Sequence, residues 1–150
     1  SFVAGSDPLG YTIVTVKYDP AGNPLWQRVF DNPGTKELGT WVTVDKDGNA
    51  VVTGYNVIPS NGTPTGIIVL KYDTNGNLLW QDLIPNALGF ALRADTDATG
   101  NIYVLGRLWV TNTSGNTTSD VALIKYAPNG TRLWTRTFGF DAFSADNPTS

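Results

Sequence analysis

Three segments of similar sequence recur along this chain at a constant interval. They cover residues 16–26, 70–80 and 124–134, and read VKYDPAGNPLW, LKYDTNGNLLW and IKYAPNGTRLW. The lysines stand at positions 17, 71 and 125, so both steps are equal, and the tryptophans at 26, 80 and 134 keep the same interval. A period on the order of 50 residues is typical of repeat proteins, in which each repeat is one supersecondary unit. The chain is therefore predicted to fold as a series of similar units.

A second module supports the same conclusion. Residues 45–54 (DKDGNAVVTG) match residues 97–106 (DATGNIYVLG). A third copy is found only when the two ends are joined, as residues 146–150 followed by residues 1–5 (DNPTS, then SFVAG). The stretch from Lys125 through both ends to Lys17 is roughly 40 residues long, a normal length for a four-stranded unit. We therefore expect one unit to be split between the two termini.

Each unit is predicted to contain four antiparallel strands, which makes the fold class all-β. The first strand is expected to be short, and the third is expected to be apolar on both faces and covered on both sides. Asn and Gly between the third and fourth strands predict a hairpin turn, because both residues accept positive φ angles. The units cover approximately residues 38–84, 90–138, and 141–150 joined with 1–30. From first to fourth, the strands are expected at 41–44, 92–94 and 143–145; 50–53, 102–105 and 2–4; 12–16, 67–70 and 121–124; and 25–29, 79–83 and 133–137.

The Asp-x-x-Gly-Asn-x-Tyr-Val-x-Gly module followed by Lys-Tyr-x-x-x-Gly resembles the SBBP-type β-propeller repeats of bacteria and archaea. The resemblance covers essentially the whole chain. It implies four-stranded β-propeller blades and a secreted or cell-surface protein, but no particular activity. The chain departs from that family in having three units, whereas propellers usually have about four to eight blades.

Composition excludes several classes of function. The chain has no Cys, Met or His, so thiol chemistry, disulfides, histidine–zinc sites and a histidine base are absent. The net charge of −3 offers no basic patch for nucleic acid. No apolar run approaches the roughly 20 residues of a membrane span. The carboxylates lie mostly in repeated turn positions, and Asp45–Asn49 is interpreted as an Asx-type turn and not as a calcium loop. We expect no catalytic residues, no metal, no cofactor and no enzymatic activity.

Four Asn-x-Ser/Thr sequons, at Asn61, Asn112, Asn116 and Asn129, lie in predicted turns or loops. This pattern accepts N-linked glycans in exported proteins, although chance also produces it in chains rich in Asn and Thr. The two loops richest in these residues, 56–65 and 109–119, are expected to face solvent. These sequons indicate a glycoprotein that is located outside the cell or on its surface.

The split unit predicts self-association. We expect Phe2, Val3 and Ala4 of one chain to pair with Phe143, Ser144 and Ala145 of another. Such a head-to-tail contact closes into a ring if its rotation allows and otherwise continues as a filament. Two chains would form a six-bladed ring. In the alternative interpretation, the 150 residues are half of a longer propeller.

Two further interpretations concern side chains. The repeated lysines and tryptophans are interpreted as structural, with tryptophan packing between units. Trp41, Arg93, Asp95 and Trp109 are candidate ligand-binding residues, because two are aromatic and the others form a polar cluster with Asp97 near a first strand. They support a second hypothesis of a carbohydrate- or protein-binding propeller. Trp41 aligns with Arg93, which argues against one equivalent sugar site per unit.

Overall fold

The computed structural model describes residues 1–9, 11–85, 89–111 and 117–139, and within these ranges the chain forms strands and turns without a helix. The predicted all-β fold is confirmed. The strands are β1 (Phe2–Ser6), β2 (Ile13–Tyr18), β3 (Pro24–Phe30), β4 (Lys36–Val44), β5 (Ala50–Val57), β6 (Pro64–Tyr72), β7 (Leu78–Pro85), β8 (Gly89–Thr96), β9 (Ile102–Thr111), β10 (Thr117–Tyr126) and β11 (Arg132–Phe138). No helix in these ranges is long and apolar enough to cross a membrane.

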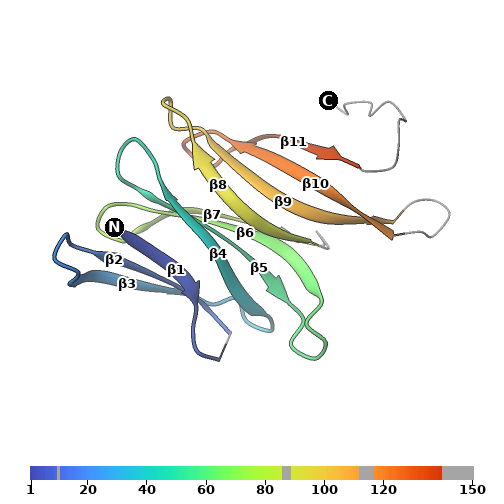
Figure 1. Ribbon diagram of the computed structural model, residues 1–150, viewed down its shortest axis with the longest axis horizontal. Coiled ribbons are helices and arrows are strands. Elements are labelled where there is room, and N and C mark those ends of the chain that lie inside the picture. The colour runs from blue at the N-terminus through green and yellow to red at the C-terminus, as the bar shows by residue number, and fades with distance from the viewer. Residues whose placement is uncertain (10, 86–88, 112–116, 140–150) are drawn as a thin grey trace.

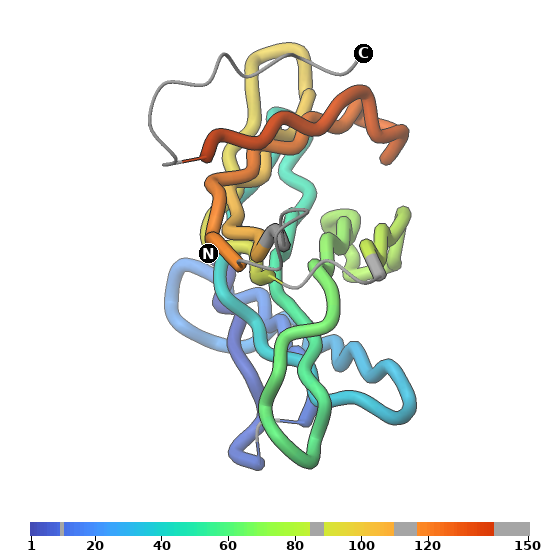
Figure 2. The backbone as a smooth tube through the Cα atoms, turned by 90° about the vertical axis from the view of Figure 1, so that its right-hand side faces the viewer, coloured from blue at the N-terminus to red at the C-terminus, as the bar shows by residue number. Residues whose placement is uncertain are grey.

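The strands form three antiparallel sheets in which neighbours along the chain are neighbours in the sheet. We call them the N-terminal sheet (β1-β2-β3), the middle sheet (β4-β5-β6-β7) and the C-terminal sheet (β8-β9-β10-β11). Figure 1 shows them following one another in chain order, and Figure 2 shows the blue N-terminal and the orange C-terminal sheets at opposite ends of the molecule. The three sheets do not close on one another.

The sequence repeat is also a repeat of strand register. Lys17 lies opposite Phe2 on one side and Trp26 on the other, and Lys125 lies likewise between Tyr103 and Trp134. Lys71 takes the same place in the middle sheet. In all three sheets the register shifts directly after the lysine, at the following tyrosine. Positions separated by one period of the sequence are therefore structurally equivalent.

Two apolar layers hold the sheets together. Between the N-terminal and middle sheets, Ile13 packs with residues of the middle sheet such as Val52 and Leu70. Between the middle and C-terminal sheets, Val69 packs with residues such as Ile124. In β6 every residue from Gly66 to Tyr72 is buried, as expected of a strand covered on both faces. Among the described residues the expectation is wrong for β2 and β10, which alternate over part of their length between buried and half-buried residues, because only one of their faces meets another described sheet.

The first strands are longer than expected. Instead of spanning three or four residues, β4 has nine and β8 has eight. Each continues through a register shift, between Gly39 and Trp41 in β4 and between Ala91 and Arg93 in β8. Such shifts let a strand bend and keep pairing, which sequence alternation alone does not reveal. The predicted loops at 56–65 and 109–119 are likewise partly strand, because β5, β6, β9 and β10 extend into them.

Candidate assembly interface

The contacts between neighbouring sheets are concentrated on hairpin turns. The turn between β6 and β7, residues 73–77, receives two side chains of the N-terminal sheet. Lys17 Nζ donates a hydrogen bond to the Thr74 carbonyl oxygen at 2.7 Å, and Trp26 Nε1 donates to the same oxygen at 3.1 Å. We call this arrangement, a lysine and a tryptophan of one sheet sharing a turn carbonyl of the next, a clasp.

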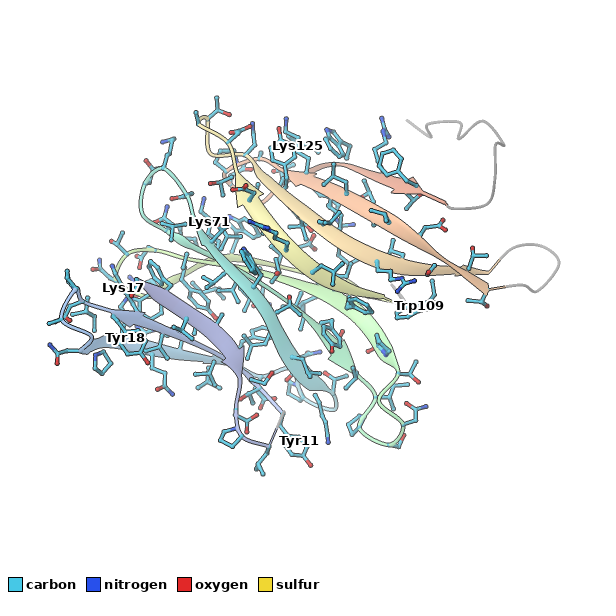
Figure 3. All side chains as sticks on the ribbon, viewed as in Figure 1. Tyr11, Lys17, Tyr18, Lys71, Trp109 and Lys125 are labelled. Atoms are coloured by element: carbon cyan, nitrogen blue, oxygen red, sulfur yellow. The ribbon has the colours of Figure 1, made fainter. Side chains whose placement is uncertain are left out.

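A second clasp joins the middle sheet to the C-terminal sheet. Lys71 Nζ donates to the Pro128 carbonyl oxygen at 3.0 Å, and Trp80 Nε1 donates to it at 3.1 Å. Pro128 follows Thr74 by one period of the sequence, and the two donors follow Lys17 and Trp26 by the same period. Figure 3 shows Lys17, Lys71 and Lys125 in a row across the three sheets. The clasp is therefore part of the repeat.

Aromatic packing strengthens each clasp. The ring of Trp26 lies 6.1 Å from that of Tyr72, and the ring of Trp80 lies 5.7 Å from that of Tyr126. Both tyrosines are nearly inaccessible, with 4% and 0% of their surface exposed. Burial raises the pKa of Tyr72 and of Tyr126 above the ordinary value of a phenol. Trp26 and Trp80 thus pack between neighbouring sheets, as their recurrence predicted.

The turn glycine of each clasp provides room for the indole. Gly76 has φ +83°, and an added Cβ would lie 2.9 Å from Cδ2 of Trp26. Gly130 has φ +89°, and an added Cβ would lie 2.7 Å from Cγ of Trp80. Any other residue would be strained at this φ and would also push the indole away. Glycine is therefore required here both by the turn and by the neighbouring sheet.

Each of the two clasps also has side-chain interactions that the other lacks. At the first clasp, Arg28 Nε donates to the Gly76 carbonyl oxygen at 2.6 Å. At the second, Asp82 replaces that arginine and its carboxylate accepts hydrogen bonds from Tyr126 Oη at 2.9 Å and from Arg132 at 2.7 Å. The two interfaces therefore share a geometry but differ in charge.

Lys71 also forms a buried ion pair. Its ammonium lies 2.8 Å from Oδ2 of Asp45, and these side chains are only 4% and 1% exposed. Burial raises the pKa of Asp45, but hydrogen bonds from Lys71 and Asn49 outweigh it and hold that pKa below its usual range. One lysine thus links the β4–β5 turn of its own sheet to a turn of the next sheet.

The Asp45–Asn49 segment is the Asx-type turn that the sequence predicted. Oδ1 of Asp45 accepts hydrogen bonds from the backbone N–H of Asp47 and Asn49, and Oδ2 accepts one from Nδ2 of Asn49. Asp97 is held in the same way by Asn101, and hydrogen bonds from Thr99 and Asn101 lower its pKa. In the described part of the chain, no group of three acidic residues could hold a metal ion.

The predicted subunit-interface residues Phe2, Val3 and Ala4 lie on β1. Within the described ranges, β1 pairs with β2 alone, whereas the corresponding strands β5 and β9 each lie between two neighbours. Phe2 also packs on Trp26, with 5.7 Å between ring centroids. Their proposed partners Phe143, Ser144 and Ala145 lie outside the described residues.

The four candidate ligand-binding residues fall in two places. Arg93 on β8 stacks over Trp41 on β4 at 4.6 Å from the ring centroid, and Asp95 is exposed farther along β8. Trp109 on β9 is half-buried against Phe90 and lies apart, near the far end of the C-terminal sheet in Figure 3. It lines a pocket of about 290 Å³ whose other lining residues are Asn61, Gly62, Thr63, Pro64 and Thr117. Asp97, expected in the cluster of Arg93 and Asp95, is instead held within its own turn.

Two of the four sequon asparagines can be placed. Asn61 and Asn129 are exposed residues of turns, and the Oδ1 atom of each accepts a hydrogen bond from the backbone N–H two residues later. This leaves the Nδ2 atoms, to which a glycan would be attached, out of those bonds. Asn112 and Asn116 lie outside the described residues.

Comparisons with known proteins do not identify the chain: no protein-family model and no curated protein sequence matches it.

Proposed function

We propose that this protein is a non-enzymatic, extracellular structural protein whose copies join head to tail. Its sheets would act as blades of a β-propeller, and each joint would complete the split blade, giving a closed ring or a filament. The observation that carries the proposal is the edge of β1 that has no partner strand among the described residues, where the middle and C-terminal sheets have four strands and the N-terminal sheet has three.

The repeat suggests how the missing strand would be supplied. In the middle sheet, Val42 of β4 lies opposite Val52 of β5. The equivalent pair is Phe143 and Val3, so Phe143–Ala145 of one copy would extend along β1 of another. An added strand binds through backbone hydrogen bonds and gains specificity from alternate side chains. An unpaired edge strand is also a liability that proteins normally cover.

The extracellular location rests on the sequons and on the resemblance to secreted repeat proteins. Asn61 and Asn129 are exposed and belong to turns, where a glycan is readily accommodated. The location is tested by the intact mass of protein purified from its natural source, before and after enzymatic removal of N-linked glycans. If the mass of the protein does not change, none of the four sequons carries such a glycan, and the glycoprotein part of the proposal is contradicted.

The assembly is tested with Phe143→Asp in the full chain. A charge in the added strand should oppose its pairing on β1, so the variant should be monomeric where the wild type forms larger species. Leu79→Asp is the matched control, because Leu79 is 50% exposed and its equivalents Leu25 and Leu133 are 58% and 50% exposed. Light scattering coupled to size-exclusion chromatography gives the masses. Wild-type protein that stays monomeric at millimolar concentration would overturn the proposed function.

A binding function is the second candidate, because the pocket beside Trp109 combines an indole with polar groups of Asn61, Thr63 and Thr117. Aromatic faces with nearby hydrogen-bonding groups suit sugar rings. A glycan on Asn61 would cover the rim of this same pocket, so the two uses exclude each other there. A glycan array with wild-type protein and Trp109→Ala tests it, and binding unaffected by the substitution would contradict this site.

A further inference from the structure

We infer that a third clasp forms between two copies of this chain, in which Lys125 and Trp134 of one copy donate hydrogen bonds to the 19–23 turn of the other. The Pro20 carbonyl oxygen is the shared acceptor. This inference rests on the proposed head-to-tail assembly and assigns it a second set of contacts, separate from strand pairing on β1. It follows from equivalence, because Pro20 stands one period of the sequence before Thr74 and two periods before Pro128.

The donor half of this clasp is already arranged in the C-terminal sheet. Lys125 Nζ lies over the ring of Tyr103 at 5.0 Å, and the ring of Trp134 lies 6.2 Å from Tyr103. Lys17 and Trp26 are arranged in the same way around Phe2, at 5.5 Å and 5.7 Å. In the first clasp this arrangement aims both donors at one carbonyl oxygen.

These two donors differ from their equivalents in lacking an acceptor. Among the described residues, neither Lys125 Nζ nor Trp134 Nε1 donates a hydrogen bond, whereas Lys17, Lys71, Trp26 and Trp80 all do. Both side chains are half-buried, and neither donor atom is among the described side-chain atoms that are buried without a hydrogen-bond partner. A turn carbonyl of another copy would satisfy both.

The acceptor half is equally complete on the N-terminal sheet. The 19–23 turn is closed by Asp19, which accepts hydrogen bonds from both the backbone N–H and Nδ2 of Asn23, as Asp73 does from Asn77. Gly22 has φ +88° and no atom within 4 Å of an added Cβ. Its equivalents Gly76 and Gly130 are each covered by an indole. The space over Gly22 fits the indole of Trp134.

Aromatic side chains that are less covered than their equivalents complete the match. Tyr18 is half-buried, whereas its equivalents Tyr72 and Tyr126 are almost fully covered by the preceding sheet. Figure 3 shows Tyr18 beside Lys17 at the end of the molecule opposite the C-terminal sheet. On the donor side, Phe138 is 51% exposed, whereas its equivalents Phe30 and Ile84 pack against the two cores. A second copy is the partner that would cover both residues in the way the internal interfaces do.

The experiment uses two full-length variants that disable opposite halves, Trp134→Ala and Tyr18→Ser. Leu133→Ala and Leu25→Ala are matched controls on the same two sheets, because their equivalent Leu79 stays 50% exposed although its sheet has a neighbour on both sides. Each clasp variant should weaken assembly at least about tenfold, as expected for a buried aromatic anchor, while the controls assemble like the wild type. Circular dichroism of each variant at a concentration where it is monomeric confirms that its fold is intact.

A mixture of the two variants sharpens the test. Tyr18→Ser keeps the donor half and Trp134→Ala keeps the acceptor half, so one intact clasp remains between unlike copies. Native mass spectrometry of ¹⁵N-labelled Trp134→Ala with unlabelled Tyr18→Ser should therefore show mixed species in excess over either variant alone.

If the wild type and both variants assemble equally, the clasp is overturned and the proposed function stands. If the wild type does not assemble, both are overturned. If both variants are weakened but do not combine, the two residues do not face each other and the clasp is overturned.

Discussion

Lys71 shows how one residue performs two tasks in this fold. Its ammonium is nearly inaccessible, and burying a charge is costly unless it is paired and hydrogen-bonded. Asp45 supplies the opposite charge and Pro128 supplies a further acceptor. The same lysine therefore stabilises a turn of its own sheet and the contact to the next one. A smaller or uncharged side chain would leave Asp45 buried without its counter-charge.

Glu37 is the single glutamate of the chain, and its burial is not balanced in this way. It is 0% exposed; Oε1 accepts a hydrogen bond from Thr35, while Oε2 has no hydrogen-bond partner within the described ranges. Asn56 lies opposite it in the strand register, and its Oδ1 is also buried without a partner. Burial raises the pKa of Glu37 above its ordinary value of 4.5. The protonated acid, which can donate from Oε2, is the form that suits this place.

A dependence of stability on pH follows. Because the pKa of Glu37 is raised in the folded state, its stabilising contribution is complete below about pH 4.5 and is lost as the pH rises through the folded-state pKa. Glu37→Gln, which stays neutral, should be more stable than the wild type at pH 7, and the difference should shrink towards pH 4. Urea unfolding of both proteins at several pH values measures this. A difference that does not change with pH would mean that Glu37 is not the titrating group.

At the scale of elements, the five-residue hairpin turn is the unit that is used repeatedly. It is closed by its own hydrogen bonds, as in the backbone bonds from Asp73 N to Asn77 O and from Gly76 N to Asp73 O. Its second carbonyl then points outward and is free to accept from the neighbouring sheet. A turn that is stable by itself can therefore serve as a rigid docking point.

The turn glycines allow this docking role to be measured. Gly22→Ala and Gly76→Ala both place alanine at positive φ, which should cost about 1–2 kcal/mol of unfolding free energy. Gly76→Ala also pushes against Trp26, so it should cost about 1–3 kcal/mol more, as overpacking does. Denaturant unfolding of the single copy, at a concentration too low for assembly, gives both values. Equal costs would show that Trp26 does not depend on the space over Gly76.

The repeat made the strand order and the turns predictable, but not the interface. Residues such as Gly76 and Trp26 recur visibly, so their turn and packing roles could be predicted from the spacing. The acceptors Thr74 and Pro128 could not, because a backbone carbonyl looks the same at every residue. The length of β4 was missed because Lys36–Gly39 precede a register shift and do not align with the rest of the strand pattern. The pairing of Arg132 with Asp82 breaks the repeat and has no signal in it.

At the scale of the whole molecule, the number of sheets limits the closed assemblies. If the joint between copies repeats the contacts within one copy, every closed ring contains a multiple of three sheets. Propellers usually have about four to eight blades, and six is the multiple of three in that range. We therefore expect a ring of two copies, with twice the 16.1 kDa of one chain. Native mass spectrometry over a range of concentrations tests this. An open-ended series of masses would indicate a filament instead.

The burial of β6 has a consequence for how the backbone opens to solvent. Because this strand is covered on both faces by its own chain, its amide hydrogens should exchange with heavy water only when the whole domain unfolds. The equivalent strands β2 and β10 have one less protected face, so their amides should exchange through smaller, more frequent openings. In the proposed assembly, joining copies would cover those faces. In the assembly, the amides of all three sheets should thus exchange only when the whole domain unfolds. In a single chain, the outer sheets should unfold and exchange first.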